Sequence, residues 1–240
     1  MFGNATTTPS RDSLESANAL IVGMGALGCA AAAALARAGI GRLTLIDDDR
    51  VEPTNLQRQI LFDDTTLGKR KVEAAALALA ATAPGCKVTA HADRVGRENA
   101  DRYFDGCSVV VDATDDPRAK YLLNRVATLR RTPFVYGGVA RAGGMAMLVD
   151  PERSACLQCA FPQTPRDEEE AGCDRMGILA PVAGVIGSLQ AYLALRVLID
   201  DRSAAGTLFV YDLHGPRWRA LGFSRDIKCP ACIDAATRAA

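Results

Sequence analysis

The sequence predicts an α/β fold in which a mainly parallel sheet, flanked by helices, is continued by antiparallel strands in the C-terminal half. Three observations predict it. Short apolar strands alternate with helices over residues 19–136. The pattern Gly23-Met-Gly-Ala-Leu-Gly28 joins the first strand to an alanine-rich helix, which is typical of Rossmann-like sheets. Two Cys-x-x-Cys pairs in the second half predict a four-cysteine zinc site.

The first half is expected to alternate strands and helices. Gly39 ends the first helix, Pro84 ends the second, and Pro117 suits the first turn of the third. The expected helices are 26–38, 68–83 and 117–130, and the expected strands are 19–22, 42–46, 87–92, 108–111 and 134–136. Such alternation produces a parallel sheet, so ligands are expected beyond the carboxyl ends of its strands.

The second half has a different pattern. An alternating strand is expected at 144–149, a long helix at 181–198, and two further strands at 208–211 and 218–222. Residues 161–180 are polar and acidic at their start, which predicts a mobile loop. We expect a single domain over 18–240, preceded by a segment, 1–17, that is disordered in part.

Composition narrows the possible partners. The 240 residues include 28 Lys and Arg against 28 Asp and Glu, so no basic excess favours nucleic acid or an anionic membrane. No apolar run is expected to be long and charge-free enough to span a bilayer, and the polar N-terminus has no signal-peptide pattern. Eight cysteines without a secretion signal fit a reducing cytoplasm.

The cysteine pairs carry the most specific local signal. Cys156 and Cys159 form one pair, and Cys229 and Cys232 form the other. Each short spacing lets both sulfurs of a pair reach one metal ion, and four thiolates suit a tetrahedral structural zinc. We therefore predict one zinc ion held by these four residues.

A nucleotide site is predicted where the glycine pattern opens the first helix. The N-terminus of a helix offers backbone N–H groups to phosphates. Asp47, at the tip of the next strand, is placed to bond a ribose hydroxyl. These features alone suit an NAD-dependent dehydrogenase, which stays open as an alternative.

The loop after Asp47 favours a triphosphate instead. It holds Asn55-Leu-Gln-Arg58-Gln59, and Lys71 starts the next helix. Cations in this crevice would stabilise the charge that develops during nucleotidyl transfer. The alternative is that Arg58 and Lys71 are ordinary solvated surface charges. Asp115 and Asp116 follow the fourth strand and offer oxygen ligands for Mg²⁺. Capping of the helix at Pro117 is the alternative role for Asp116.

In combination these motifs resemble the ThiF/MoeB/HesA family, the bacterial relatives of ubiquitin-activating enzymes. The resemblance covers residues 18–232, and the ordered features that carry it are the glycine pattern, Asp47-Asp-Asp, Asn55–Gln59, Asp112-Ala-Thr-Asp-Asp116, Ala180–Gln190 and the two cysteine pairs. It implies adenylylation of the C-terminal glycine of a ubiquitin-like sulfur carrier, ThiS or MoaD, by ATP and Mg²⁺. It also implies a homodimer and, as a further partner, a sulfur donor of the desulfurase or rhodanese type.

The resemblance also assigns roles by position. Asp47 would hold the ribose, Asn55, Arg58 and Lys71 the phosphates, and Asp115 the Mg²⁺ ion and the transition state. The nucleotide-binding set it implies is Gly23, Gly25, Ala26, Gly28, Asp47, Asn55, Arg58, Gln59, Lys71, Asp115 and Asp116. Cys173 falls where the family places a reactive cysteine, which in the thiamin branch takes part in sulfur transfer. The sequence around Arg58 leans toward that branch.

Three departures from the family pattern keep a third interpretation open. Asp116 stands where the family has an amide, and Lys120 stands where it has an arginine. The family's N-terminal arginine segment is missing, and Arg11 is the only stand-in. A non-catalytic scaffold that binds a ubiquitin-like protein is therefore the second alternative.

Overall fold

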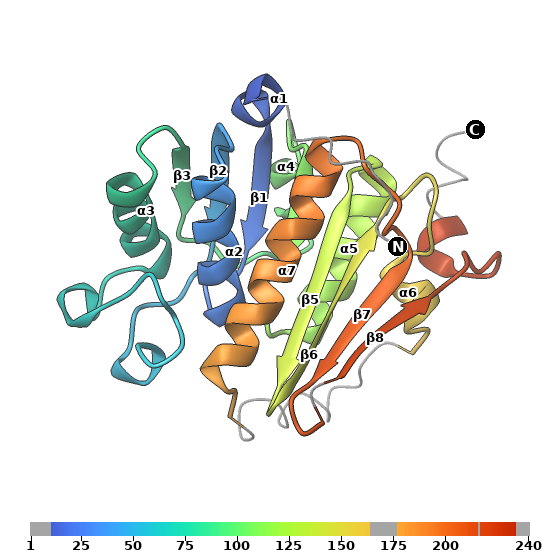
Figure 1. The fold of residues 1–240 in the computed structure, drawn as a ribbon. Helices are drawn as coiled ribbons and strands as arrows, with labels where there is room; N and C mark the ends of the chain where they lie inside the picture. The colour runs from blue at the N-terminus through green and yellow to red at the C-terminus, as the bar shows by residue number, and fades with distance from the viewer. Residues whose placement is uncertain (1–10, 164–176, 216, 234–240) are drawn as a thin grey trace.

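One eight-stranded sheet runs through the protein, in the order β3-β2-β1-β4-β5-β6-β7-β8 (Figure 1). The structure is a computed structural model, and it describes residues 11–163, 177–215 and 217–233. The strands are β1 (Asn18–Val22), β2 (Arg42–Ile46), β3 (Lys87–His91), β4 (Val109–Asp112), β5 (Phe134–Ala140), β6 (Gly143–Val149), β7 (Thr207–Asp212) and β8 (Arg217–Gly222). Strands β1 to β5 run parallel to one another, and β6 to β8 continue the sheet in antiparallel pairs, as the sequence predicts.

The register of the parallel strands brings their carboxyl ends to one edge. Val22 at the end of β1 pairs with Ile46 of β2 and with Asp112 of β4. The residues that follow these three strands therefore meet at the same edge of the sheet. This edge is where an α/β sheet of this kind binds ligands.

Helices cover both faces of the sheet (Figure 1). The helices α2 (Ala26–Arg37), α3 (Lys71–Thr82) and α7 (Ala180–Leu198) share one core, and α4 (Ala100–Tyr103), α5 (Pro117–Arg130) and α6 (Leu157–Ala160) share the other. Small residues let α2 and α7 approach closely, because a Cβ on Gly187 would lie 2.6 Å from the carbonyl oxygen of Leu27. The alanine bias of α2 thus has a packing function.

By length and composition alone, α7 is long and apolar enough to cross a membrane. The expectation that the sequence has no apolar run of that length is therefore wrong by this criterion. The same helix packs against α2, β4, β5 and β6. Half of the apolar stretch of this helix is buried inside the fold. Its apolar character therefore has a cause within the core.

Several short elements escape the sequence prediction. These are α4, α6 and two 3₁₀ turns, Pro53–Asn55 and Asp64–Thr66. Of the segment 1–17, the structure describes residues 11–17, and α1 (Arg11–Ser16) is a helix there. Of the predicted loop 161–180, it describes 161–163 and 177–180 only, so the predicted mobility lies outside the described residues.

Candidate functional site

The residues predicted to bind the nucleotide gather at the carboxyl edge of the parallel strands. The N–H of Gly23 donates to the carbonyl oxygen of Ile46 at 2.8 Å, and that of Ala113 donates to the carbonyl oxygen of Val22 at 2.8 Å. The N–H of Asp47 donates to the carbonyl oxygen of His91 at 3.3 Å. The turns that follow β1, β2, β3 and β4 are therefore neighbours.

The glycine turn combines tight packing with an open face. Gly23 has a φ of 94°, and a Cβ there would lie 2.6 Å from the carbonyl oxygen of Ala113. A Cβ on Gly28 would lie 1.9 Å from the carbonyl oxygen of Gly23, so both positions require glycine. At Gly25, the N-cap of α2, a Cβ would meet no atom within 4 Å. The space in front of Gly25 and Ala26 thus suits a phosphate at a helix N-terminus.

Asp47 is fixed by this turn. Its Oδ2 accepts a hydrogen bond of 2.6 Å from the N–H of Met24, and its Oδ1 accepts one of 2.8 Å from the N–H of Asp49. Burial raises the pKa of Asp47 above its ordinary value, while the Met24 hydrogen bond and the charge of Lys71 act against the rise. A carboxylate oxygen can accept more than one hydrogen bond, so Asp47 keeps acceptor capacity for a ribose hydroxyl.

Lys71 is a buried cation, and its interpretation as a solvated surface charge is wrong. The residue is 7% exposed, and its Nζ lies 2.8 Å from the Oδ2 of Asp49. The Asp49 side chain is 66% exposed, so this partner can yield to a ligand anion. Sequence reasoning missed the pairing, although the acidic run at 47–49 was its signal.

The loop between β2 and α3 uses part of its polar groups internally. The Oδ1 of Asn55 accepts from the N–H of Glu52 at 3.1 Å, and Arg58 donates from Nη1 to the carbonyl oxygen of Thr54 at 2.8 Å. Gln59 is buried, and its Oε1 has no hydrogen-bond partner among the described residues. A buried amide oxygen without a partner can accept a hydrogen bond from a ligand or from a water molecule.

Asp115 and Asp116 have different environments. Asp115 is exposed and makes no hydrogen bond or ion pair with any residue that the structure describes. The Oδ1 of Asp116 accepts from the N–H of Arg118 at 2.8 Å, which confirms the alternative role of Asp116 as the cap of α5. Its Oδ2 lies 3.8 Å from Nη2 of Arg94 on the loop after β3. Asp115 is thus the freer carboxylate for Mg²⁺, and a nucleotide role for Asp116 stays a prediction.

The four predicted cysteines form one cluster. The Sγ atoms lie 3.8 Å apart for Cys156 and Cys159, 3.6 Å for Cys156 and Cys229, and 3.7 Å for Cys159 and Cys232. All four sulfurs lie within 4.8 Å of one another. A tetrahedral zinc with bonds of about 2.3 Å has sulfur–sulfur edges of about 3.8 Å, so the cluster fits the ion.

Groups around the cluster also suit metal-bound thiolates. The N–H of Asp226 donates to the Sγ of Cys159 at 3.4 Å, and the side-chain amide of Asn124 donates to the Sγ of Cys156 at 3.7 Å. Hydrogen bonding, first of all from Cys232, lowers the pKa of Cys156 to about 5. Burial raises the pKa of Cys229 to about 12, and the charge of Cys156 adds to this rise. Four thiolates together therefore need a cation.

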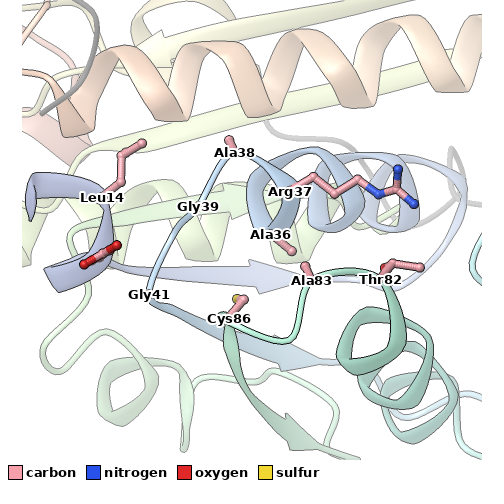
Figure 2. A pocket seen from close by; sticks show the side chains of 11 residues that line it. Leu14, Ala36, Arg37, Ala38, Gly39, Gly41, Thr82, Ala83 and Cys86 are labelled. Carbon is pink, nitrogen blue, oxygen red and sulfur yellow. The ribbon is translucent and has the colours of Figure 1, made fainter. Parts of the chain in front are cut away.

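One predicted residue lies outside the described part of the chain, and one hollow lies away from the site. Cys173 lies outside the described residues, so its predicted role in sulfur transfer stays a prediction. A hollow of about 720 Å³ lies at the opposite edge of the sheet, beside the C-terminal ends of α2 and α3 (Figure 2). Its lining is mostly alanine and glycine, and none of the predicted nucleotide residues belongs to it.

Comparison with known proteins places the chain in a family. Residues 3–231 match the model of the ThiF family. The SAMP-activating enzyme E1 of Haloferax volcanii is 34% identical over 220 residues, which are 91% of this chain and 81% of the relative. The adenylyltransferase and sulfurtransferase MOCS3 of Culex quinquefasciatus is 34% identical over 223 residues, 92% of this chain and 51% of the relative. The chain spans about half the length of the MOCS3 relatives it matches.

Solved structures agree with the fold. The Microcin C7 biosynthetic enzyme MccB in complex with N-formylated MccA has a TM-score of 0.82 and 22% identity, over 92% of this chain and 69% of that one. Escherichia coli MccB with ATP has a TM-score of 0.80 and 23% identity, over 92% and 68% of the two chains. At this identity the likeness concerns the fold alone.

Proposed function

The chain belongs to the ThiF family, and on that premise we propose that it adenylylates the C-terminal carboxylate of a ubiquitin-like sulfur carrier. Relatives of the same family carry the names adenylyltransferase and activating enzyme E1. The observation that carries the proposal is the buried Lys71 ammonium. It pairs with Asp49 at 2.8 Å, and the N–H of Asp49 in turn donates to the Oδ1 of Asp47. A cation held beside a glycine turn suits a triphosphate.

The proposed reaction is an in-line displacement at the α-phosphorus of ATP. An oxygen of the carrier's terminal carboxylate forms a bond to phosphorus, the bond to the β-phosphate bridging oxygen breaks, and pyrophosphate leaves with the electron pair. No proton moves, because the attacking carboxylate is already ionised. Catalysis then consists of positioning and of charge stabilisation.

The residues at the carboxyl edge of the parallel strands have different roles in this reaction. The N-terminus of α2 at Gly25 and Ala26 receives phosphate oxygens, Asp47 holds the ribose, and Lys71 exchanges Asp49 for the triphosphate. Asp115 would hold Mg²⁺, which neutralises the phosphate charges when it is bound. Arg58 and Asn55 stand on the adjoining loop as further phosphate ligands, once their internal hydrogen bonds open.

The cysteine cluster has a separate role in the proposal. One zinc ion would be held by Cys156, Cys159, Cys229 and Cys232, and it would tie α6 to the C-terminal segment. Zinc with four thiolate ligands keeps no open position for substrate, so its contribution is structural.

The carrier is proposed to be of the ThiS or MoaD type, with a C-terminal Gly-Gly. The leaning toward the thiamin branch assigns Cys173 to sulfur transfer after adenylylation, with a desulfurase or rhodanese as donor. A homodimer in the cytoplasm is the proposed working form. An NAD-dependent oxidoreductase fits less well, because it leaves the buried Lys71 and the exposed Asp115 without a role.

Carrier-dependent exchange of labelled pyrophosphate into ATP tests the proposal. Wild-type protein with a carrier ending in Gly-Gly should exchange, and Lys71→Ala should lose about a hundredfold or more, because one charge-stabilising group is gone. Lys69→Ala is the matched control, since Lys69 is exposed and two residues away. Absence of wild-type exchange with ThiS-type and MoaD-type carriers would favour the non-catalytic scaffold.

A further inference from the structure

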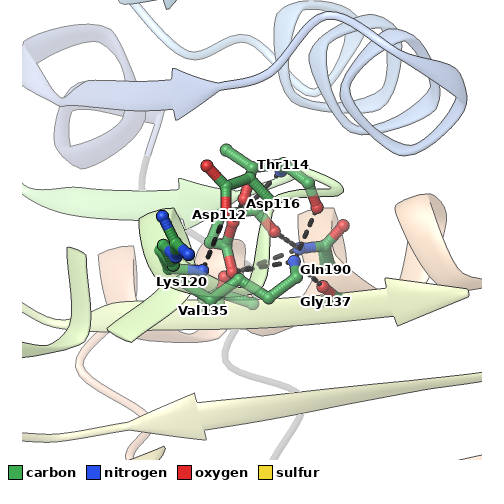
Figure 3. A network of polar contacts seen from close by, with 8 residues as sticks. Asp112, Thr114, Asp116, Lys120, Val135, Gly137 and Gln190 are labelled. Atoms are coloured by element: carbon green, nitrogen blue, oxygen red, sulfur yellow. Dashed lines mark hydrogen bonds and ion pairs between the residues drawn. The ribbon is translucent and has the colours of Figure 1, made fainter. Parts of the chain in front are cut away.

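A buried ion pair joins Asp112, at the start of the loop that carries Asp115, to Lys120 (Figure 3). The Asp112 side chain, at the end of β4, is 0% exposed, and the Lys120 side chain, on α5, is 12% exposed. Their Nζ and Oδ2 atoms lie 3.1 Å apart. In the sequence, Asp112 stands out only as the start of the Asp112–Asp116 motif, and Lys120 only as a departure from the family pattern.

The ammonium of Lys120 has all its hydrogen-bonding capacity in use. Nζ lies 3.1 Å from the Oδ2 of Asp112, 2.6 Å from the carbonyl oxygen of Thr114 and 2.6 Å from the carbonyl oxygen of Gly137. An ammonium has three protons, so it has none left for a ligand. Lys120 is therefore not placed to touch a phosphate itself.

The remaining oxygen of Asp112 closes the same loop. Its Oδ1 accepts from the N–H of Thr114 at 3.1 Å and from the Oγ1 of Thr114 at 2.7 Å. Burial raises the pKa of Asp112, and the charge of Lys120 is the largest influence that opposes the rise. The backbone from Asp112 to Thr114 is thus held at its carbonyl, at its N–H and through a side chain, one residue before Asp115.

The network is anchored on the far side by α7. The Nε2 of Gln190 donates to the carbonyl oxygen of Asp112 at 2.6 Å. Gly137 is needed beside it, because a Cβ there would lie 2.3 Å from the Gln190 side chain. Three elements therefore converge on the end of β4: α5 through Lys120, β5 through Gly137, and α7 through Gln190.

We infer that Lys120 is a positioning residue that holds Asp115 in its working place. The inference rests on the proposed function for what Asp115 does, and on the contacts above for how it is held. Lys120 binds the loop at two points, Asp112 and Thr114, and a third bond fixes it to β5. A single ammonium nitrogen can serve these acceptors together, whereas a planar guanidinium has its donors spread over a fork.

Lys120→Met tests the inference, with Lys87→Met as control, since Lys87 is an exposed lysine at the opposite end of the sheet. Removing a group that orients a catalytic ligand typically costs 10- to 100-fold. We expect kcat of carrier-dependent pyrophosphate exchange to fall by about that factor in Lys120→Met, with the KM for ATP changed by less than about threefold. Lys87→Met should match wild type in both.

A double-mutant cycle separates positioning from general damage. If Lys120 acts through Asp115, adding Lys120→Met to Asp115→Ala should lower kcat no further, because the two losses are coupled. Fully multiplied losses would overturn the inference. A wild-type kcat in the single variant Lys120→Met would overturn it as well.

Amide hydrogen exchange measures how firmly Lys120 holds the loop of Asp115, and it needs no carrier. The segment 113–116 should exchange faster in Lys120→Met than in wild type or Lys87→Met, and unchanged exchange there would overturn the inference.

Failure of the proposed function would look different, because wild-type protein would then show no pyrophosphate exchange. If Lys120→Met does not fold, because Asp112 is left buried with an unpaired charge, the neutral pair Lys120→Met with Asp112→Asn is measured in its place. That pair should show the same fast exchange and the same loss of kcat.

Discussion

The two chemistry-bearing regions of this protein are built in opposite ways. At the parallel edge, Gly25 caps α2, Lys71 begins α3 and Asp115 follows β4, so the three stand on separate segments that the sheet brings together. In the cysteine cluster, Cys156 and Cys229 are 73 residues apart in the sequence, and their Sγ atoms lie 3.6 Å apart. The sheet sets the positions of the residues at the parallel edge. In the cysteine cluster, by contrast, the cysteines themselves hold two distant segments of the chain together. Substitutions at the edge should therefore change chemistry at little cost in stability, and substitutions in the cluster should do the reverse.

Loss of one cysteine should have the greatest effect on stability. Cys229→Ser is expected to remove about one zinc per chain and to cost on the order of 4 kcal/mol of unfolding free energy. For a domain of this size that is a fall of about 8–16 °C in Tm. Metal analysis and thermal unfolding measure both effects. The control is Cys107→Ser, since Cys107 lies outside the cluster, and zinc retained at the wild-type level in Cys229→Ser would contradict the assignment.

The neighbouring aspartates provide the converse test at the edge. Asp115→Ala should lower carrier-dependent pyrophosphate exchange about a hundredfold or more while leaving Tm within about 2 °C. Asp116→Ala removes the cap of α5, so it should cost about 1 kcal/mol of stability and change the exchange rate much less. Equal rates of pyrophosphate exchange in Asp115→Ala and Asp116→Ala would contradict the different roles assigned to the two aspartates.

The glycine turn provides a finer test. Gly28→Ala should destabilise the fold, because its Cβ would lie 1.9 Å from a backbone oxygen. Gly25→Ala meets no atom within 4 Å, so its Tm should stay near wild type while its affinity for ATP falls. Thermal unfolding with and without ATP distinguishes them, since a bound ligand raises Tm. Undiminished ATP stabilisation of Gly25→Ala would place the phosphates elsewhere.

Local signals explain what the sequence predicted well. The bounds of α5 follow from Asp116 as cap and Pro117 in the first turn. The cysteine cluster follows from spacing alone. By contrast, α4 and α6 have four residues each and are too short to show a helical period.

The pairings of the buried cations could not be predicted in this way. Lys71 meets Asp49 across 22 residues, and Lys120 meets the carbonyl oxygen of Gly137 across 17. Both contacts depend on how loops and strands close in space, and neither motif spacing nor residue type encodes that. A residue that looks like a surface charge in the sequence can therefore be a buried part of the site.

The most direct measurement is intact mass spectrometry of the carrier after incubation with the protein, ATP and Mg²⁺. A carrier with its C-terminal Gly-Gly should gain the mass of an AMP group, and a carrier lacking the terminal glycine should not. The Lys71→Ala protein should give at most traces of this product, and the Lys69→Ala protein should give wild-type amounts. A carrier that stays unmodified with wild-type protein, or that is modified equally by Lys71→Ala, would contradict adenylylation at the parallel edge.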